Sequence, residues 1–482
     1  MSKLKGIILQ LQQEEYDEMI CEFTRTSADK FQTLFRLYRE NTLRDDSIKE
    51  ELKVNNSAYY TLKSRLLDKV QGFLSNRFST PNVESIHKVE DIPDLIYGMS
   101  RYKAIAILKK LEVDIAVHDS PYKLASVYDA LKKLHMHTQK YYEYTQLYNR
   151  HLAYTISIDK AGDLLNDFFC KLSDWDFTRN KDELQVMSML QQELYYVCQL
   201  YDSQRLTVYR CLMDISYLLF LPIKKEIGEQ DIEKMLTNMM TVFETVPHDK
   251  YYQHQRLAHH FLSFVYFEQN GSPRLAAEHY EAVNEKIDQF LLFNHSSYPS
   301  KFLMLKLERH INLGTENRLY DDNTKLLADY EPDRRDIANY VNFMIYRSVS
   351  AYYVKHYSEA AGILVRLMNE VSFKYGPRIE SEIRLMMSLF YILAGEIDLV
   401  QTHLRSVSRK LREISKEEIT DNFTFFYKLM SLMTNTAQRI TTAKIELLVQ
   451  QFDAANKTNP ILKYIRSGEH LAFSLDMTRQ KK

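Results

Sequence analysis

Glycine is scarce in this chain: there are 11 glycines in 482 residues, and the closest two, Gly362 and Gly376, lie fourteen positions apart. Loops that cradle phosphates, turns that bind dinucleotides and elbows that carry a nucleophile place their glycines within a few residues, because the backbone there needs positive φ or approaches a ligand closely. No such cluster is present in the sequence. The scarcity excludes these common enzyme motifs and favours a chain of helices.

An excess of either charge is also lacking. Lys and Arg together number 63, and Asp and Glu together number 64. A balanced chain has no global field that would attract nucleic acid or anionic lipid. Binding of either kind would have to be local.

Neither a cysteine motif nor a targeting segment is present. The four cysteines, Cys21, Cys170, Cys198 and Cys211, have no CxxC spacing, which favours reduced thiols over a disulfide framework or a zinc site. The opening residues MSKLKGIILQLQQEEYDE are interrupted by Gln and Glu before a secretory core is complete. No apolar run approaches the ~20 residues that span a bilayer. The sequence predicts a soluble cytoplasmic protein without a membrane partner.

Apolar residues are abundant and recur at helical spacing. The chain is 45% apolar and 12% aromatic, and in residues 338–354 Val341, Ile345, Val349 and Tyr352 form one stripe. Prolines punctuate this pattern every one or two helices, as expected near helix starts; they are Pro222, Pro247, Pro273, Pro299, Pro332 and Pro377. We therefore expect an all-α protein.

Successive segments repeat a helix, a short turn and a second helix. The clearest are AYYVKHYSEAAGILVRLMNEV around Tyr357 and LFYILAGEIDLVQTHLRSVSRKL after it. Over residues 255–415 the chain resembles the tetratricopeptide repeat family. The matching positions are Gly271, Ala276 and Tyr280, then Tyr357, Ala360 and Leu364, then Tyr391, Gly395 and Leu404. The better copies are 40 residues apart where the family has 34, and Val400 and Phe264 replace small residues.

The resemblance implies a right-handed superhelical array of antiparallel helix pairs over residues 81–482. First helices would line a concave face that holds a peptide or a partner's helix. This register predicts the concave positions Asn342, Ile345, Val349, Tyr352, Tyr353, Glu382, Leu385, Leu389, Ile392 and Leu393. The groove is either open to a partner or filled by the same chain, and the frequency of apolar stripes in cores favours the second alternative.

Residues 1–80 are predicted to form a separate helical unit. Within residues 29–75, a first helix, a short second helix and a long third helix, with a turn at Val54 and Asn55 between the last two, resemble a helix-turn-helix domain. If Ala58, Leu62 and Leu66 face inward, the outward positions that could contact DNA are Asn56, Tyr59, Tyr60 and Lys63.

The charge of this segment is mildly positive. Residues 25–80 contain 11 Lys and Arg against 7 Asp and Glu, a balance of +4. Strong DNA binders concentrate more positive charge, since phosphate neutralisation supplies much of the affinity. Three small helices also pack in this way for stability alone, so both interpretations stay open.

Candidate catalytic and metal-binding groups are weak. His135 and His137 are two apart, His259 and His260 are adjacent, and neither spacing suits a zinc pair on a helix. Asp174 and Asp176 flank Trp175, where we expect them to cap the following helix rather than to act as an acid and base pair. We predict no catalytic residue, no metal and no cofactor.

The sequence thus leads to a non-enzymatic helical-repeat protein that binds a protein or peptide. The alternative is a DNA-binding regulator with an amino-terminal helix-turn-helix and a helical-repeat sensor or dimerisation domain, as in bacterial regulators that pair these modules. An enzyme is the third possibility. The sequence specifies neither the partner nor the oligomeric state.

Overall fold

The structure is a computed structural model in which every described element is a helix. It describes residues 3–9, 11, 13–25, 28–40, 45–77, 89–98, 100–116, 120–201, 203–222, 229–245, 249–293, 296–327, 330–413, 421–434, 442–457 and 461–465. No strand occurs within these ranges, as the all-α prediction requires. None of the described helices is both long enough and apolar enough to cross a membrane.

The chain divides into two compact units. Unit 1 covers residues 1–155 and unit 2 covers residues 156–482. Helix α10 (Lys140–Thr178) begins in the first and ends in the second. The boundary expected near residue 80 falls within 78–88, outside the described residues.

Unit 1 has two hydrophobic cores. The first is built by five helices, with Leu34, Phe35 and Tyr38 at its centre. These helices are α1 (Lys3–Leu9), α2 (Gln13–Arg25), α3 (Asp29–Glu40), α4 (Asp45–Glu51) and α5 (Asn56–Arg77). The second core joins α7 (Ile92–Gly98), α8 (Arg101–Ala116) and α9 (Pro121–Leu134) to the start of α10 through residues such as Leu108 and Leu131.

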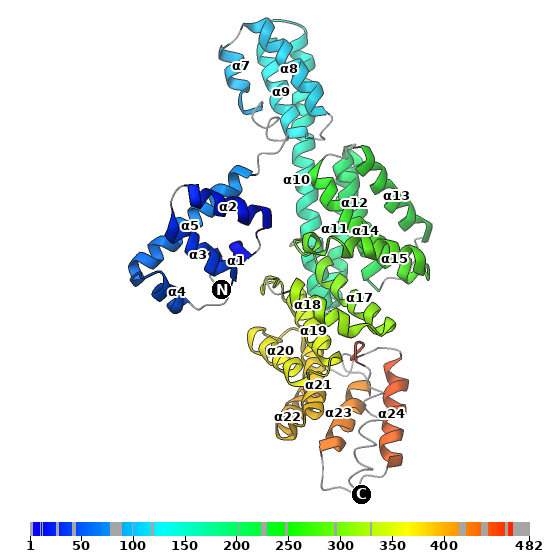
Figure 1. The fold of residues 1–482 in the computed structure, drawn as a ribbon. Helices are drawn as coiled ribbons and strands as arrows, with labels where there is room; N and C mark the ends of the chain where they lie inside the picture. The colour runs from blue at the N-terminus through cyan, green and yellow to red at the C-terminus, as the bar shows by residue number, and fades with distance from the viewer. Residues whose placement is uncertain are drawn as a thin grey trace. The chain divides into compact units, whose positions relative to one another are not determined.

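Unit 2 consists of helix pairs that pack in series, so neighbours in sequence lie side by side (Figure 1). After α11 (Lys181–Leu200), the two members of each pair contact each other. The pairs are α12 (Gln204–Phe220) with α13 (Glu229–Thr245), α14 (Lys250–Gln269) with α15 (Pro273–Asn284), α17 (Tyr298–Leu313) with α18 (Glu316–Leu326), α19 (Ile337–Tyr353) with α20 (Tyr357–Glu370), α21 (Pro377–Ala394) with α22 (Ile397–Glu413), and α23 (Asp421–Thr434) with α24 (Thr442–Asn456). The four-residue α16 (Ile287–Phe290) follows α15.

Four consecutive pairs share one turn geometry. Their first helices, α14, α17, α19 and α21, are each followed within two residues by a residue with positive φ: Gly271 (66°), Gly314 (67°), Lys355 (65°) and Gly395 (81°). A left-handed residue at this place satisfies the last carbonyls of a helix and redirects the chain, and glycine takes it without steric cost. These turns recur about every 40 residues, a longer interval than the 34 of a tetratricopeptide repeat.

Aromatic side chains connect one pair to the next. The buried Tyr298 at the start of α17 lies 5.1 Å from Phe169 of α10 and 5.1 Å from Phe261 of α14, measured between ring centroids. Its hydroxyl is 2.7 Å from the Ser216 hydroxyl of α12, so the phenol is satisfied inside the core. Tyr298 of α17 thus contacts three other helices, α10, α12 and α14.

Small residues line the contact between α19 and α20. Ala360 and Ala361 of α20 are fully buried, and the Ser348 hydroxyl of α19 donates to the Ala360 carbonyl at 2.7 Å. Gly362 in the same helix is exposed, and a side chain there would meet nothing within 4 Å.

We therefore expect Ala360→Arg to lower the free energy of unfolding by about 3 kcal/mol or more, because an unpaired charge and extra volume would enter the α19 to α20 contact. The matched control, Gly362→Arg, should be neutral or slightly stabilising, since it replaces an exposed helical glycine. Urea unfolding followed by circular dichroism measures both, and equal effects of the two substitutions would show that this contact is not tight.

Three histidines meet between α14 and α15. The Nδ1 atoms of His260 and His279 are 2.9 Å apart, and the Nε2 of His259 is 3.1 Å from the Leu236 carbonyl. Burial, reinforced by the neighbouring histidines, lowers the pKa of His259 to about 3 and that of His260 to about 4. Both side chains are therefore neutral at physiological pH.

These histidines predict an acid-sensitive fold. The unfolded chain binds protons at histidine below about pH 6.5, whereas His260 in the folded chain does so only near pH 4, so stability should fall as the pH drops through this window. His260→Asn should flatten this dependence, by up to about 1.4 kcal/mol per pH unit. Urea unfolding between pH 4 and 7 measures the slope, and the exposed His137→Asn is the control; identical slopes in both variants would contradict the assignment.

Candidate functional site

The first helices of five of the six pairs in unit 2 line a common cavity of about 380 Å³. Residues from α12, α14, α17, α19 and α21 line it, whereas none of the described residues of their second helices does. The end of α10 contributes as well. We call this the first-helix groove; Lys301, Met304, Asn342, Ile345, Glu382 and Met386 are among its lining residues. Five first helices therefore contribute to the same cavity.

Two side chains that line the groove form an ion pair. The ammonium of Lys301 contacts the Asp176 carboxylate and lies 4.9 Å from the centroid of the Phe220 ring. Arg179 forms a longer ion pair with Asp176, at 3.8 Å. The expected helix cap at Asp174 and Asp176 is wrong, because α10 continues to Thr178 and Asn180 caps α11 through the Asp182 amide at 3.1 Å. Asp176 instead fixes the Lys301 ammonium in the groove.

A short segment of the same chain, residues 461–465 (ILKYI), lies against the groove. The Glu382 carboxylate accepts a hydrogen bond from the Leu462 amide at 2.6 Å, and the Tyr353 hydroxyl donates to the Tyr464 carbonyl at 2.9 Å. Lys463 pairs with Glu308 of α17 at 2.8 Å. Leu462, Tyr464 and Ile465 also line the cavity. We call residues 461–465 the docked segment.

The docked segment forms a tight turn. The Leu462 carbonyl accepts from the Ile465 amide at 3.0 Å, and Leu462 itself has φ of 53°. A left-handed conformation costs a leucine about 1 to 2 kcal/mol. The contacts of the turn with its surroundings offset this cost, since Ile461, Leu462 and Ile465 are all buried.

Glu382 is the polar centre of this contact. Burial raises the pKa of its carboxyl above the ordinary value, while the Leu462 amide and the guanidinium groups of Arg378 and Arg179 act in the opposite direction. A buried carboxylate is stable only with such partners. The main chain of the docked segment is one of them, so the groove recognises backbone as well as side chains.

The predicted concave positions divide into two groups. Asn342, Ile345, Tyr353 and Glu382 are half-buried and lie in the groove or contact the docked segment. Val349, Tyr352, Leu385 and Leu389 are instead buried in the core, where other residues of the same chain cover them. The Tyr352 ring, for example, stacks on Phe390 of α21 with centroids 5.2 Å apart. Ile392 and Leu393 are half-buried against that core.

Several groove residues were missed by sequence reasoning. Asp176 comes from α10, Arg179 follows the end of that helix, and Lys301 comes from α17; all three lie outside the two pairs whose register the sequence indicated. The docked segment carries only a weak signal, since Ile461 and Ile465 lie four residues apart after Pro460. Nothing in that signal shows which surface the segment covers.

A second cavity, of about 720 Å³, lies among α11, α12 and α13. Within it the Asp214 carboxylate accepts from Gln191 at 2.8 Å and pairs with Arg210 at 3.3 Å. Burial raises the pKa of the Cys198 thiol to about 11 and that of Cys211 to about 12, which keeps both protonated. Protonated thiols are poor nucleophiles. The described residues also contain no group of three His, Cys, Asp or Glu side chains arranged to hold a metal.

The helix-turn-helix-like segment differs from its prediction at α5. Tyr59, expected to face outward, is fully buried, and its hydroxyl lies 2.8 Å from the Tyr38 hydroxyl. Ala58, expected inward, is exposed. Leu62 and Leu66 face the core as expected, and Tyr59 takes the place of Ala58 at the start of their apolar stripe. A buried tyrosine removes far more apolar surface from water than a buried alanine would.

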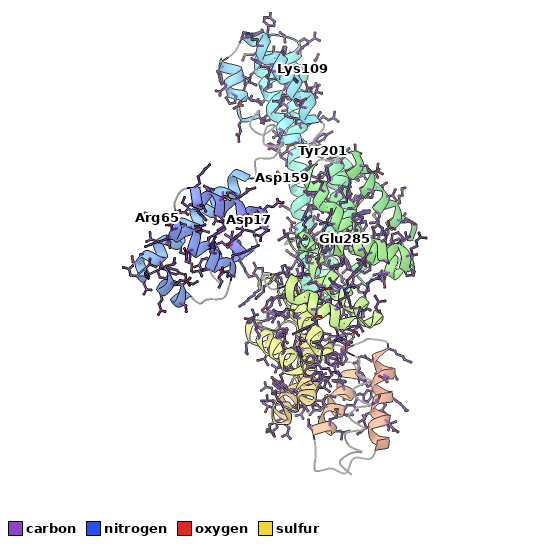
Figure 2. All side chains as sticks on the ribbon, in the orientation of Figure 1. Asp17, Arg65, Lys109, Asp159, Tyr201 and Glu285 are labelled. Carbon is purple, nitrogen blue, oxygen red and sulfur yellow. The ribbon has the colours of Figure 1, made fainter. Side chains whose placement is uncertain are left out.

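The remaining predicted positions of this segment are partly accessible. Asn56 is exposed, Tyr60 is 62% exposed, and Lys63 is half-buried with its ammonium 5.7 Å from the Tyr59 ring centroid. Asn55 caps the helix, since its side chain accepts from the Ala58 amide at 2.8 Å. Arg65, labelled in Figure 2, is exposed two positions beyond Lys63. The first turns of α5 therefore offer a small polar surface.

No known family, curated protein sequence or solved structure matches this chain significantly. The functional interpretation consequently rests on the geometry of the groove and of α5.

Proposed function

We propose that this protein is a non-enzymatic interaction protein whose first-helix groove binds a peptide segment of a partner protein. The proposal includes a tetratricopeptide-like superhelical arrangement of the pairs, with first helices on the concave face. The observation that carries it is the docked segment, which is held through a backbone amide by Glu382 and through a backbone carbonyl by Tyr353. A groove that holds one segment in this way has the chemistry to hold another.

The division of contacts supports peptide recognition. Main-chain hydrogen bonds provide affinity for many sequences, while apolar pockets and charges select among them. Here Glu382 and Tyr353 contact the main chain of the docked segment. Met304 and Ile345 supply apolar surface, and Lys301 with Asp176 adds a charged pair. Five first helices contribute to one cavity, so a ligand would contact several pairs at once.

A peptide-display selection on the full-length chain tests the proposal. We expect enriched peptides to bind the wild-type chain and to lose at least tenfold in affinity for Ile345→Asp, because a charge would enter the apolar wall of the groove. The matched control is Leu399→Asp on the second helix α22, where the leucine is 45% exposed and lies outside the groove. Fluorescence anisotropy with labelled peptides gives the affinities.

Circular dichroism first establishes that both variants fold. Selected peptides that bind Ile345→Asp as tightly as the control would contradict the groove as the binding site. A selection that enriches no peptide for the wild-type chain would contradict peptide binding itself.

The second candidate function is DNA binding through unit 1. The observation in its favour is the exposed start of α5, where Asn56, Tyr60 and Arg65 lie on accessible positions of a segment with a charge balance of +4. Helix-turn-helix proteins place this part of their recognition helix in the major groove. Lys63 is less suitable as a probe because its ammonium also lies over aromatic rings.

If the chain binds DNA, Arg65→Glu should weaken binding to mixed-sequence duplex by about tenfold at low salt and reduce the salt dependence, since a phosphate contact would be lost. Lys110→Glu, the same charge change at an exposed position of α8, is the control. Anisotropy titrations of the full-length chain at two salt concentrations measure this. No binding by the wild-type chain at low salt would remove the candidate.

A further inference from the structure

The docked segment has the properties of a bound ligand that belongs to the same chain. Three aliphatic residues, Ile461, Leu462 and Ile465, are buried, while Lys463 is exposed to about half on the side of Glu308. Its two outward main-chain bonds go to Glu382 of α21 and Tyr353 of α19, the first helices of two adjacent pairs. The segment is therefore held through its aliphatic side chains, through its lysine and through its main chain at the same time.

The left-handed Leu462 distinguishes this contact from ordinary packing. A leucine leaves the right-handed region only when its surroundings determine its conformation. Here the Leu462 amide points to Glu382, and the Ile465 amide closes the turn on the Leu462 carbonyl. The groove thus accepts a turn with a specific direction of its amide, which a straight strand would not present.

The docked segment is anchored at one end and makes its groove contacts with the residues that follow. On its amino-terminal side, Asn456 accepts from the Ile461 amide at 2.8 Å and donates to the Ile461 carbonyl at 3.1 Å, so this end is anchored to α24. The contacts of Leu462, Lys463 and Tyr464 with α17, α19 and α21 are made by groups that any peptide with the same pattern could supply in their place.

We propose that the docked segment is an intramolecular mimic of the partner, and that the partner presents the same pattern: two aliphatic residues, a basic residue, an aromatic residue and an aliphatic residue in a turn. This inference rests on the proposed peptide-binding function and specifies its ligand. The basic residue pairs with Glu308, and the amide of the second aliphatic residue donates to Glu382. The segment occupies the site until such a partner displaces it.

The test uses a labelled peptide with the sequence of residues 459–468, NPILKYIRSG, and the full-length chain. The double variant Leu462→Asp and Ile465→Asp should release the internal segment and bind the peptide at least tenfold more tightly than the wild-type chain. The reason is that a tethered competitor acts at an effective concentration near the millimolar range. A scrambled peptide of the same composition is the control.

A milder variant covers the case in which the double variant does not fold. Lys463→Glu changes a half-exposed residue and places like charges together at Glu308, so it should tighten peptide binding severalfold without unfolding the chain. A charge exchange then tests the register. Glu308→Lys should weaken binding of the natural peptide and strengthen binding of a peptide in which Glu replaces the lysine that corresponds to Lys463.

Equal affinity of the natural peptide for wild-type chain and for both released variants would overturn the proposal, as would equal binding of the scrambled peptide. These failures differ from failure of the proposed function. The display selection could yield peptides whose binding requires Ile345 but whose sequences lack the aliphatic and basic pattern. That result would support the groove as a binding site and contradict only the proposal that residues 461–465 mimic the partner. A selection that yields no groove-dependent peptide would remove both.

Discussion

The burial of apolar faces between successive helix pairs is the constraint on which unit 2 depends. A single pair has one covered face and one that only the next pair can cover, so each addition to the array stabilises its predecessor. Tyr298 shows the mechanism at one position, because its ring packs between Phe169 and Phe261 while its hydroxyl is satisfied by Ser216. The cost of burying a phenol is thereby removed at the centre of the core.

The same constraint produces the groove. A residue with positive φ follows α14, α17, α19 and α21 at the same place in each pair, and all four of these first helices line one cavity. Where several first helices meet, half-buried residues such as Asn342 and Ile345 remain beside the charged pair of Lys301 and Asp176. The docked segment lies against this groove, and its Leu462 amide donates a hydrogen bond to the Glu382 carboxylate, which would be costly to leave without a donor.

In unit 1, one hydrogen-bonded pair decides the rotation of α5. Burying Tyr59 against Tyr38 turns the helix so that Ala58 faces solvent, and the aromatic pair is favourable because each hydroxyl partners the other. This rotation removes one of the four positions predicted to contact DNA and leaves Asn56 and Tyr60 accessible. The prediction buried Ala58 instead of Tyr59 because apolar spacing alone does not show that the Tyr59 hydroxyl has a hydrogen-bond partner in the core.

Much of the local structure was determined by the sequence itself. Sparse glycine, helical periodicity and prolines at helix starts specified an all-α chain, and Gly271 and Gly395 marked turns because their conformation is a local property of the backbone. The register of α19 and α21 was also local, and it placed Asn342, Ile345, Tyr353 and Glu382 on the same predicted stripes as residues that the structure buries. Only the tertiary structure decided which stripe residues are core, since Val349 and Leu389 differ from Ile345 in what packs on them rather than in chemistry. The meeting of residues 461–465 with Glu382 and Glu308 was likewise a tertiary outcome, because contacts between segments far apart in the chain depend on how the intervening helices pack.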